Sequence, residues 1–541
     1  MEAEMAKYPK RTDQVFQYGT SGFRDKAEKL DYLVFRMGLL ASLRSRVKGS
    51  AAIGLMITAS HNPEPDNGVK LIDPLGEMLE QSWEPLATQL VNVSDEKLEE
   101  ELRQIAKSTG ADMSKPSLVF VGQDTRPSSS RLADAAIAGA KAYNGQVVDQ
   151  GIVSTPLLHY LVNTYNTSSS KVLPSKESYY VKLSSAFNGL LKEGGLKKNY
   201  DKELQFDGSN GIGALVMKKL TPLLQDNLKV NVHNDDVKSA GKLNYKCGSD
   251  YVMSNQLPPE GFSIQPDKKI ASVDGDADRI VYSFIDSKGS FYLLDGDRIA
   301  VLVAEYLLEL LKNSGLDLEL GLVQTAYSNG NCTKYINEKL KIPVSCVSTG
   351  VKHLHHKATE YDIGVYFEAN GHGTVIFSNN AQNLITQAIN DEKLDETKRN
   401  WVLKLKHTTD VINSIVGDAV SDMLLVETIL YTKDWSIKDW ASAYTNLPSK
   451  LVKVFVKDRN VIKTTDAERK CTHPVGLQEE IDSIVSEYQF GRSFVRPSGT
   501  EDVVRVYAEA ATQEMVDQLA SRVAQAVSSL ACGVEPMNSK I

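Results

Sequence analysis

Asp274, Asp276 and Asp278 alternate with small residues in a short segment with the composition of a metal site. In an extended or looping backbone this alternation can point three carboxylates to one side, where they repel each other unless a cation sits among them. Oxygen-only ligands suit a hard ion such as Mg²⁺ or Ca²⁺ rather than zinc. An EF-hand would need Gly and Glu where this sequence has Arg279 and Ile285, so that reading fails. A solvated acidic loop is the remaining alternative.

Ser60 and His61 lie in a second chemically suggestive segment, Thr58–Pro63. The apolar run Ala51–Ile57 ends directly before it, and Pro63 prevents simple continuation of a strand. Open α/β sheets hold their ligands in loops of this kind, beyond the ends of buried strands. An ordinary capped turn is the alternative, because Ser and Asn are common in turns.

A third segment has the composition of an anion-binding loop, with small and hydroxyl residues between arginines: Arg496, Ser498, Gly499, Thr500 and Arg505. Glycine beside Ser and Thr lets backbone N–H groups and hydroxyls converge on an anion. The two arginines can add forked, charge-assisted hydrogen bonds to phosphate. Taken alone, the segment is equally compatible with a polar turn. The chain contains neither a Walker A motif nor a dinucleotide-binding fingerprint.

The elements that must position these loops follow from the apolar patterns around them. Strand-like runs, Lys269–Val273 and Ile280–Ile285, flank the acidic segment and predict a loop between strands. A second Asp-Gly-Asp at 295–297 lacks a third carboxylate and leads into an amphipathic helix with Gly315 beyond its end. The apolar face of that helix comprises Ile299, Leu302, Val303, Tyr306, Leu307, Leu310 and Leu311. We therefore interpret residues 295–297 as a helix start and not as a metal site.

Length and composition indicate a large enzyme-like chain. Its 541 residues predict three to four domains, and 42% apolar with 24% charged residues suffice for ordinary cores. A net charge of −8 gives no indication of a nucleic-acid-binding surface. Five cysteines, odd in number and without C-x-x-C, favour a reducing compartment and no structural zinc. No apolar run is long enough to span a membrane, and the first residues lack the apolar core of a signal peptide, so we expect a cytoplasmic protein.

Several of these segments together resemble the α-D-phosphohexomutase family. The matching segments are Gly19–Arg24, Thr58–Pro63 with Asp66–Lys70, Asp274–Arg279, Glu368–Gly373 and Arg496–Thr500. They span nearly the whole chain, and separate loops in family order are far more specific than any one of them. The resemblance implies three related mixed-sheet α/β domains plus a C-terminal α+β domain around a central cleft. Periodicity alone indicates only a mixed α/β chain with several domains.

The expected division has four units. Residues 1–180 would form the phosphoserine domain, 181–298 the metal-binding domain, 299–440 the sugar-binding domain and 441–541 the phosphate-binding domain. A stretch rich in Ser, Thr, Asn and Lys, 164–180, reads as a linker at the end of the first.

Two features are similar to the acetylglucosamine branch of the family. The segments Gly122–Ser128 and Gly151–Pro156 follow Ser60, whereas in most family members their counterparts precede the serine. The sugar loop also reads Glu-Ala-Asn-Gly-His, where phosphomannomutases and phosphoglucosamine mutases usually have Glu-x-Ser-Gly-His. The resemblance implies interconversion of N-acetylglucosamine 6-phosphate and 1-phosphate through a phosphoserine and a 1,6-bisphosphate, feeding UDP-N-acetylglucosamine synthesis. The alternatives are a mutase for glucose or glucosamine phosphates, a non-catalytic sugar-phosphate-binding protein and a metal-dependent phosphatase.

The resemblance also implies roles for individual residues. Ser60 would carry the phosphoryl group, and an oxygen of its phosphate would join Asp274, Asp276 and Asp278 around one Mg²⁺. Arg24 would stabilise charge, while Lys70 or His372 would handle protons or position the substrate. His61 would either orient Ser60 or cap the turn. Arg279 would contact the substrate or pair with neighbouring carboxylates.

Substrate binding is expected from two loops. Glu368 and Asn370 would hydrogen-bond sugar hydroxyls, within a loop that also holds Gly371 and His372. The non-reacting phosphate would be held by Arg496, Ser498, Gly499, Thr500 and Arg505. Histidines at 353, 355 and 356 lack the spacing of helical zinc motifs, so we expect a polar helix there instead of a second metal site. The oligomeric state is left open.

Overall fold

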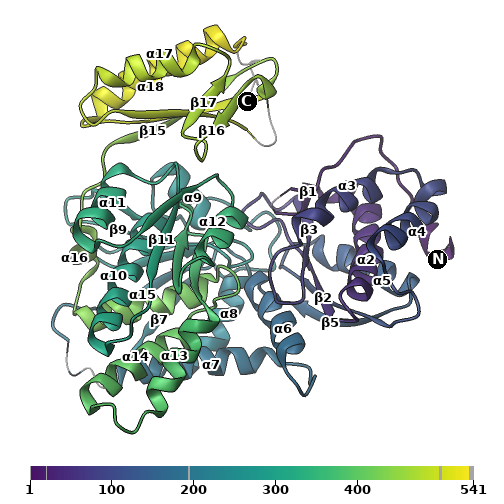
Figure 1. The fold of residues 1–541 in the computed structure, drawn as a ribbon, viewed down its shortest axis with the longest axis horizontal. Coiled ribbons are helices and arrows are strands. Elements are labelled where there is room, and N and C mark those ends of the chain that lie inside the picture. Colours follow the sequence, from purple (N-terminus) through teal and green to yellow (C-terminus); the bar gives the residue numbers. More distant parts are fainter. Residues whose placement is uncertain (1, 20, 193–194, 196, 499–501, 535–541) are drawn as a thin grey trace.

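The computed structural model describes residues 2–19, 21–192, 195, 197–498 and 502–534. Within them, sheets flanked by helices follow one another along the chain (Figure 1). The N-terminal unit lies to the right in this view, the two central units to the left, and the C-terminal unit above them. The expected architecture, three related mixed-sheet α/β units and a C-terminal α+β unit, is confirmed.

The first unit is built on a five-stranded sheet in the order β1-β3-β2-β4-β5. Its strands are β1 (Phe23–Lys26), β2 (Ala52–Ile57), β3 (Asp66–Ile72), β4 (Ser117–Gln123) and β5 (Gly145–Ile152). Its helices are α1 (Glu2–Met5), α2 (Asp31–Val47), α3 (Glu84–Asn92), α4 (Leu98–Thr109), α5 (Ser129–Ala142) and α6 (Thr155–Thr167), with short turns η1 (Ala27–Lys29), η2 (Gln81–Trp83) and η3 (Asp95–Lys97).

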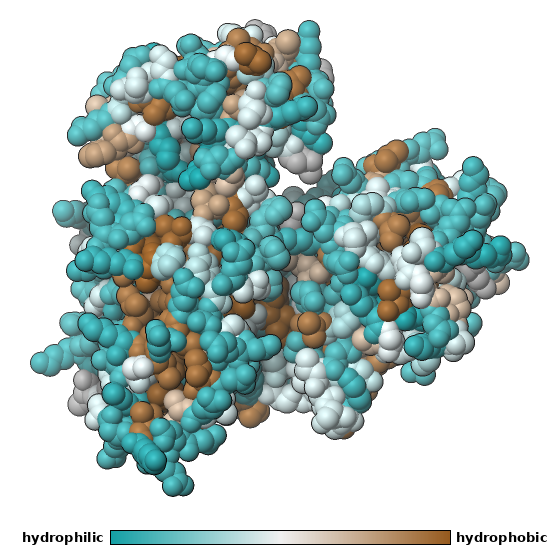
Figure 2. Space-filling view, in the orientation of Figure 1, coloured by the Kyte–Doolittle hydropathy of each residue, from teal (hydrophilic) through white to brown (hydrophobic). Residues whose placement is uncertain are grey.

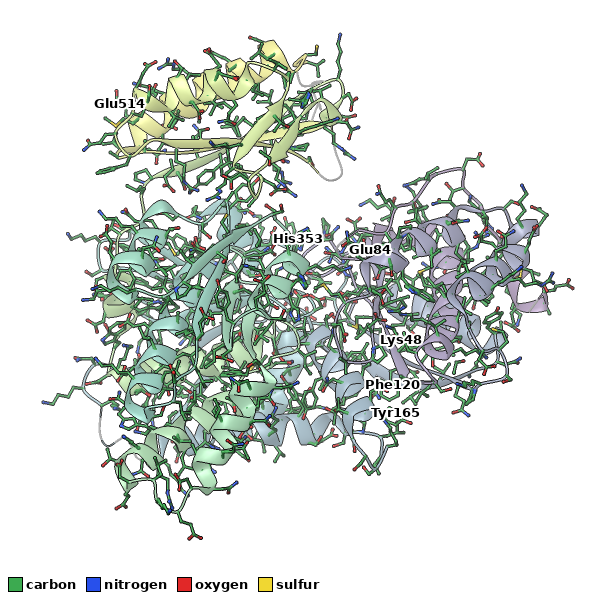
Figure 3. The ribbon with its side chains drawn as sticks, viewed as in Figure 1. Lys48, Glu84, Phe120, Tyr165, His353 and Glu514 are labelled. Carbon is green, nitrogen blue, oxygen red and sulfur yellow. The ribbon has the colours of Figure 1, made fainter. Side chains whose placement is uncertain are left out.

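Strand β2 is buried on both faces, which explains its unbroken apolar sequence. Ile53, Leu55 and Ile57 pack in the core beneath α2 and α5, whereas Met56 joins the core on the opposite face, below α6. On that second face the rings of Phe120 and Tyr165 lie 5.4 Å apart, and both are labelled in Figure 3. The serine loop therefore begins at the end of a fixed central strand.

The second unit has the sheet order β10-β9-β8-β6-β7, and the third has β12-β11-β13-β14. The second comprises α7 (Lys176–Leu191), β6 (Glu203–Asp207), α8 (Ile212–Leu220), η4 (Thr221–Asn227), β7 (Lys229–His233), α9 (Ser249–Asn255), β8 (Ile270–Val273), β9 (Ile280–Ile285) and β10 (Phe291–Leu294). The third comprises α10 (Gly296–Ser314), β11 (Leu320–Thr325), α11 (Gly330–Tyr335), η5 (Ile336–Leu340), β12 (Val344–Val347), α12 (Val351–Ala358), β13 (Ile363–Phe367), β14 (Gly373–Phe377), α13 (Asn379–Asn390), α14 (Glu396–Val411), α15 (Ala419–Lys433) and α16 (Ile437–Ala441).

The C-terminal unit differs from the others in topology. Its sheet has the antiparallel order β15-β19-β18, beside a separate β16–β17 hairpin. Its elements are β15 (Ser449–Phe455), η6 (Arg459–Val461), β16 (Lys463–Thr465), β17 (Lys470–His473), α17 (Leu477–Ser486), β18 (Arg492–Pro497), β19 (Val503–Glu509) and α18 (Gln513–Leu530). Figure 2 shows a hollow on this face between the C-terminal and N-terminal units, and a gathering of apolar side chains over the central units.

The first three sheets share one local pattern. In each, a strand that runs parallel to a neighbour is followed by a loop and then by an antiparallel partner: β2 and β3, β8 and β9, β13 and β14. The three loops between these pairs are the serine loop, the acidic loop and the sugar loop of the sequence analysis. Equivalent loops of three related sheets thus have different functional groups: a serine hydroxyl, a cluster of carboxylates, and the Glu-Ala-Asn-Gly-His sequence expected to bind sugar.

Some expectations about organisation need adjustment. The boundaries expected after residues 180, 298 and 440 fall inside α7, α10 and α16, so we would move each one to a helix end. The division into four units itself stays a proposal. The expected linker at 164–180 is wrong at both ends, because α6 continues to Thr167 and the Ser175 hydroxyl caps the start of α7. Among the described residues, none of the helices combines the length and hydropathy that crossing a bilayer requires.

Candidate functional site

Loops from the first three units converge on one cavity of about 150 Å³. Its walls hold six of the residues singled out from the sequence: Arg24, Lys70, Asp278, Arg279, Glu368 and His372. They also hold Ser21, Met78, His159, Gly350, Val351 and Val416. Of the described residues that line the cavity, none comes from the C-terminal unit. The cavity is small and polar, and its charged side chains come from separate parts of the chain.

Ser60 lies beside the acidic loop although more than 200 residues separate them in sequence. Its Oγ donates a hydrogen bond to Asp274 Oδ2 at 2.5 Å, and its backbone N–H donates to Thr58 Oγ1 at 2.9 Å. The residue is fully buried and has a φ of 52°, in the left-handed region that is uncommon for residues other than glycine. Backbone strain of this kind persists only where surrounding contacts determine the conformation.

Arg126 supplies many of those contacts, and the sequence analysis did not identify it. The buried guanidinium donates hydrogen bonds of 2.7–2.9 Å to four backbone carbonyl oxygens of the serine loop: those of Ser60, Asn62, Pro63 and Asp66. Asp124 holds the arginine through a 3.0 Å bond to Nε and also accepts from Thr58 Oγ1 at 2.8 Å. Arg126 therefore fixes the path of the backbone that carries Ser60.

Asn244, from the second unit, was also missed. Its side-chain amide donates to the carbonyl oxygens of Ser60 at 2.9 Å and Asn62 at 3.1 Å. Because both acceptors are backbone carbonyl oxygens, which every residue has, the sequence of the serine loop does not predict these hydrogen bonds. The segment around Arg126 was noticed only for its position in the chain.

The acidic loop brings the three aspartates together as expected. Asp274, Asp276 and Asp278 are buried, and each offers an oxygen within 4.8 Å of the others. Asp274 Oδ1 accepts the N–H groups of Asp278 at 3.0 Å and Arg279 at 3.2 Å, while Asp276 Oδ2 accepts from Thr155 Oγ1 at 2.7 Å. The Oδ1 atoms of Asp276 and Asp278 have no hydrogen-bond partner.

This donor set fits a hard divalent cation. Buried carboxylate oxygens without a hydrogen-bond donor are costly, and a cation would satisfy them. Among the described residues no other group of three His, Cys, Asp or Glu side chains converges in this way. The histidines at 353, 355 and 356 all lie on α12, as expected, and His355 Nδ1 lies 3.2 Å from the Tyr366 hydroxyl.

The pKa values of two aspartates in the acidic loop are shifted in opposite directions. Burial, together with Asp278 and Asp276, raises the pKa of Asp274 well above its ordinary value. Burial alone would also raise the pKa of Asp278, but His372, Lys70 and Arg279 hold it well below its ordinary value. One aspartate therefore tends toward the neutral form, while another stays ionised among cations.

Three basic side chains, Lys70, His372 and Arg279, surround the carboxylates. Lys70 Nζ lies 3.6 Å from Asp276 Oδ2 and 3.5 Å from Asp278 Oδ2. His372 Nδ1 lies 3.4 Å from Asp278 Oδ1. Arg279 Nε lies 3.9 Å from Asp274 Oδ2 and 3.8 Å from Asp278 Oδ1. Lys70 and His372, both expected near the reaction centre, therefore share one carboxylate partner.

His61 points its Nδ1 at the guanidinium of Arg279, whose Nη1 lies 2.8 Å away. Since arginine only donates hydrogen bonds, His61 Nδ1 must accept, and the imidazole is neutral. Burial, reinforced by Arg279 and Arg24, lowers the pKa of His61 to about 2. Ser60 Oγ lies 3.5 Å from the same nitrogen. His61 is therefore poorly suited to take a proton from Ser60, and its contacts favour a positioning role.

Arg24 reaches the site from β1, where it lies opposite Gly68 of β3. Its Nη1 donates to Asn62 Oδ1 at 3.4 Å, and its buried Nε has no partner. Burial and the nearby Arg279 lower the pKa of this guanidinium. An N–H donor held without a partner beside the cavity is available to an anionic ligand.

The sugar loop forms a tight turn between β13 and β14. His372 N donates to Asn370 Oδ1 at 2.9 Å, and Asn370 Nδ2 donates to Glu368 Oε2 at 3.2 Å. Gly371 has a φ of 83°, and a Cβ there would lie 1.8 Å from the carbonyl oxygen of Ile280. Only glycine fits, so the sugar loop sits directly against the strand that leaves the acidic loop.

His159 is a further cavity residue that the sequence analysis missed. It lies on α6, is buried, and its Nδ1 lies 2.5 Å from the carbonyl oxygen of Gly76, to which it donates. Burial, together with Lys70, lowers its pKa to about 3. No motif surrounds it, and a lone histidine on an apolar helix offers no signal for a functional position.

The expected phosphate loop lies apart from the cavity. Arg496 and Arg505 stand directly opposite each other on β18 and β19. Arg496 Nε donates to Glu468 Oε1 at 2.8 Å, and Ser498 N donates to the Val503 carbonyl at 2.8 Å. The expected ligands Gly499 and Thr500 lie outside the described residues.

Comparisons with known protein families agree with this arrangement along the chain. The model "Phosphoglucomutase/phosphomannomutase, alpha/beta/alpha domain I" matches residues 39–98 and 91–173. "Phosphoacetylglucosamine mutase AMG1, domain II" matches 170–281 and "domain III" matches 295–435. "Phosphoglucomutase/phosphomannomutase, C-terminal domain" matches 451–526.

Full-length relatives share the whole architecture. Human phosphoacetylglucosamine mutase is 49% identical, over 98% of this chain and 97% of the relative. The crystal structure of Aspergillus fumigatus N-acetylphosphoglucosamine mutase in complex with GlcNAc-6P and magnesium is 46% identical, with a TM-score of 0.93 and 98% coverage of both chains. A variant of the Aspergillus enzyme in complex with glucose 1,6-bisphosphate has a TM-score of 0.91 at 45% identity, again with 98% coverage of both.

These matches agree with the features that the sequence analysis used to choose a branch, namely the segment order of the first unit and the residues of the sugar loop. Identity above 40% extends along nearly the entire chain and is not confined to the loops. The chain belongs to the phosphoacetylglucosamine mutase family.

Proposed function

We propose that this chain interconverts N-acetylglucosamine 6-phosphate and N-acetylglucosamine 1-phosphate, in the route to UDP-N-acetylglucosamine. The observation that carries the proposal is the 2.5 Å hydrogen bond between Ser60 Oγ and Asp274, at the junction of the serine and acidic loops. Membership of the family and the GlcNAc-6P complex of the Aspergillus relative support the choice of a hexosamine phosphate substrate.

In this proposal Ser60 alternates between a phosphoserine and a free hydroxyl. A sugar hydroxyl attacks the phosphorus, the bond from phosphorus to Ser60 Oγ breaks, and the product is a 1,6-bisphosphate. The bisphosphate turns over in the cleft, and Ser60 Oγ then takes the other phosphoryl group from it. The glucose 1,6-bisphosphate complex of the relative's variant supports an intermediate of this kind.

Asp274, Asp276, Asp278 and an oxygen of phosphorylated Ser60 would hold one Mg²⁺. Magnesium bound there would supply charge stabilisation to the phosphoryl group in transfer. The partnerless Oδ1 atoms of Asp276 and Asp278 and the magnesium complex of the relative support this assignment. Thr155 and the backbone N–H groups that bind Asp274 keep the carboxylates in place.

The remaining charged residues of the cavity would have one of two roles, namely proton transfer or stabilisation of negative charge. Lys70 and His372, which share Asp278, are the candidates for proton transfer: one of them in its neutral form would accept the proton of the attacking hydroxyl, and in its protonated form would return that proton to Ser60 Oγ or to the sugar oxygen that leaves phosphorus. Arg24 and Arg279 would stabilise negative charge, since arginine stays protonated. His61, neutral and bound to Arg279, would orient that guanidinium beside Ser60.

Two loops would hold the sugar phosphate in both orientations. Glu368 and Asn370, set by the turn at Gly371, would accept and donate hydrogen bonds to sugar hydroxyls. Across the cleft, the non-reacting phosphate would bind the C-terminal loop, namely Arg496, Ser498, Gly499, Thr500 and Arg505. A cytoplasmic location and the absence of nucleic-acid or membrane partners stay predictions.

Intact-protein mass spectrometry tests the proposal most directly. Incubation of the chain with the bisphosphate and Mg²⁺ should add one phosphoryl group to Ser60, and incubation with excess monophosphate should remove it. Ser60→Ala should take up no phosphoryl group and should lose at least about 10⁴-fold in kcat, as enzymes do on loss of a nucleophile. Full turnover in Ser60→Ala would refute the mechanism.

The substrate is tested in the same assay. Turnover of the acetylated sugar phosphate should exceed that of glucose 6-phosphate and glucosamine 6-phosphate. Preference for an unacetylated sugar would favour the other mutase activity. Release of inorganic phosphate without isomerised sugar would instead indicate a phosphatase.

A further inference from the structure

The tip of the β16–β17 hairpin has an unusual backbone. Three consecutive residues, Asp466, Ala467 and Glu468, have φ values of 52°, 54° and 68°. Each residue other than glycine in this region costs on the order of 1 kcal/mol, so contacts must hold the tip in shape. Figure 1 shows the hairpin at the lower edge of the C-terminal unit, on the side that faces α12.

The carboxylate of Glu468 makes those contacts. Its Oε1 accepts a hydrogen bond from Arg496 Nε at 2.8 Å. Its Oε2 accepts from the backbone N–H of Thr349 at 2.9 Å and from Thr349 Oγ1 at 2.5 Å. The side chains of Arg496 and Glu468 are 21% and 15% exposed, so solvent screens this pair only partly.

These contacts join two parts of the substrate cleft. Arg496 belongs to the proposed phosphate loop of the C-terminal unit, whereas Thr349 directly precedes Gly350 and Val351, which line the cavity. On the other side of the same segment, Lys352 forms an ion pair with Glu84 of the first unit. His353 and Glu84, labelled in Figure 3, mark the place where α12 meets that unit.

A carboxylate bound at Nε leaves a guanidinium with other N–H donors and fixes the plane in which they lie. This matters for phosphate binding, because a forked pair of hydrogen bonds requires that plane to face the ligand. Without an acceptor at Nε, a long arginine side chain would lose several rotamers on binding phosphate. The geometry of Glu468 is therefore that of an orienting group.

We propose that Glu468 is a positioning residue, which orients Arg496 for the non-reacting phosphate of the substrate and ties the phosphate loop to the cavity rim through Thr349. The inference rests on the proposed function, since it assigns a phosphate to Arg496. It adds a residue outside the matched phosphate loop, carried by a different hairpin, on which that loop depends.

Glu468→Gln tests the role, because glutamine preserves the size of the side chain and removes its charge. We expect KM for N-acetylglucosamine 6-phosphate to rise roughly tenfold, which is the scale of a weakened charge-assisted hydrogen bond. The kcat should change less than about twofold, since the reacting atoms lie elsewhere. A general loss of structure would not separate KM from kcat, and the thermal midpoint should stay within a few degrees of wild type.

Asp466→Asn is the matched control at the same hairpin tip. Asp466 pairs with Arg469 at the surface, and both side chains are nearly half exposed, so its loss should leave KM unchanged. An equal rise in KM in this variant would show that the hairpin acts only as a whole, and would overturn the role given to Glu468. An unchanged or lowered KM in Glu468→Gln would overturn it as well, the second outcome indicating a carboxylate that competes with the phosphate.

A double variant shows whether Glu468 acts through Arg496. In an Arg496→Lys background, Glu468→Gln should raise KM by less than about twofold further, because the partner it orients is gone. Multiplication of the two single effects would overturn the inference. If wild type fails to turn over the sugar phosphate, the proposed function fails. Calorimetric binding of N-acetylglucosamine 6-phosphate to wild type and Glu468→Gln then still decides the role of Glu468.

Discussion

The tripeptide Asp-Gly-Asp occurs at 274–276 and again at 295–297, and the carboxylates of the two copies differ in their hydrogen bonding. At 295–297, Asp295 caps α10 by accepting the N–H of Arg298 at 3.2 Å. Asp297 accepts from Ser328 Oγ at 2.8 Å and from Asn329 N at 3.0 Å. In the acidic loop the Oδ1 atoms of Asp276 and Asp278 have no hydrogen-bond donor.

The difference lies in what the surrounding fold supplies. Around Asp297 a loop of the third unit provides one donor for each oxygen, so the carboxylate belongs to the structure. Around Asp276 and Asp278 the Thr155 hydroxyl donates to one oxygen, Asp276 Oδ2, and the other nearby groups include Lys70 and His372 at 3.4–3.6 Å, together with another carboxylate. Two carboxylate oxygens that are buried close together without a donor are costly, and a cation bound at this site would satisfy both. Four predictions test this contrast.

The largest expected effect is on catalysis. Asp276→Asn should lower kcat by about 10³-fold or more, since it removes charge from the proposed ligand set for Mg²⁺. Asp297→Asn makes the same chemical change in the other copy and should alter kcat less than about tenfold. Initial rates at saturating substrate measure both. Similar losses in the two variants would erase the distinction between the copies.

Metal removal should divide the variants in the same way. A chelator should abolish turnover of wild type, and added Mg²⁺ should restore it. Mg²⁺ at about 100 times its Kd should stabilise wild type and Asp297→Asn by roughly 2.7 kcal/mol, which thermal unfolding detects as a higher midpoint. Asp276→Asn should show a much smaller shift. An equal shift in Asp276→Asn would place the ion elsewhere.

Stability without metal should show the reverse order. Asp297→Ala leaves Ser328 Oγ and Asn329 N without an acceptor, and each buried donor costs about 1–3 kcal/mol. Asp276→Ala removes one member of a repelling cluster and strands the Thr155 hydroxyl, while Lys70 loses one carboxylate but keeps Asp278, so we expect a smaller loss. Denaturant titrations in a metal-free buffer give the two values. A larger loss in Asp276→Ala would mean that the acidic loop holds the structure together.

The smallest effect concerns pH. Burial, together with Asp297, raises the pKa of Asp295 to about 7, so the folded state binds this proton more tightly than the unfolded state. The resulting stabilisation is complete below the unfolded pKa and is lost as pH rises through the folded pKa. Between about pH 5 and pH 8, the thermal midpoint of wild type should therefore fall by a few degrees relative to Asp295→Asn. A parallel pH dependence in the two proteins would contradict the raised pKa.

Much of the site was predictable, because its residues occur in short runs next to clear strand and helix signals. Apolar runs before Thr58 and on either side of the acidic loop predicted β2, β8 and β9 within a residue or two. The apolar face and Gly315 predicted α10, which ends at Ser314. Three carboxylates at alternate positions predicted the cluster that the structure forms.

The residues that were missed act through backbone groups or from distant elements. Arg126 and Asn244 bind carbonyl oxygens, which every residue has, so their partners leave no trace in the sequence. Thr155 and His159 both lie on α6, Thr155 at its first position and His159 among apolar residues. A threonine at a helix start and a single buried histidine are common in purely structural roles, so neither residue indicated a site. Glu468 depends on how a hairpin of the last unit approaches the third, which local patterns do not encode.

The guanidinium of Arg126 acts as a clamp on the serine loop, because it binds four backbone carbonyl oxygens there. This clamp has a consequence for versions of the chain in which the order of the strands is permuted. Arg126 follows β4, and β4 lies beside β2 because the two strands pair in parallel, with the whole of β3 and two helices between them in sequence. The guanidinium of Arg126 therefore reaches the serine loop because β4 lies beside β2 in the sheet, whatever the order of the two strands along the chain. A permuted gene encoding β4 ahead of β2, with new ends in exposed turns, would be expected to rebuild the same clamp.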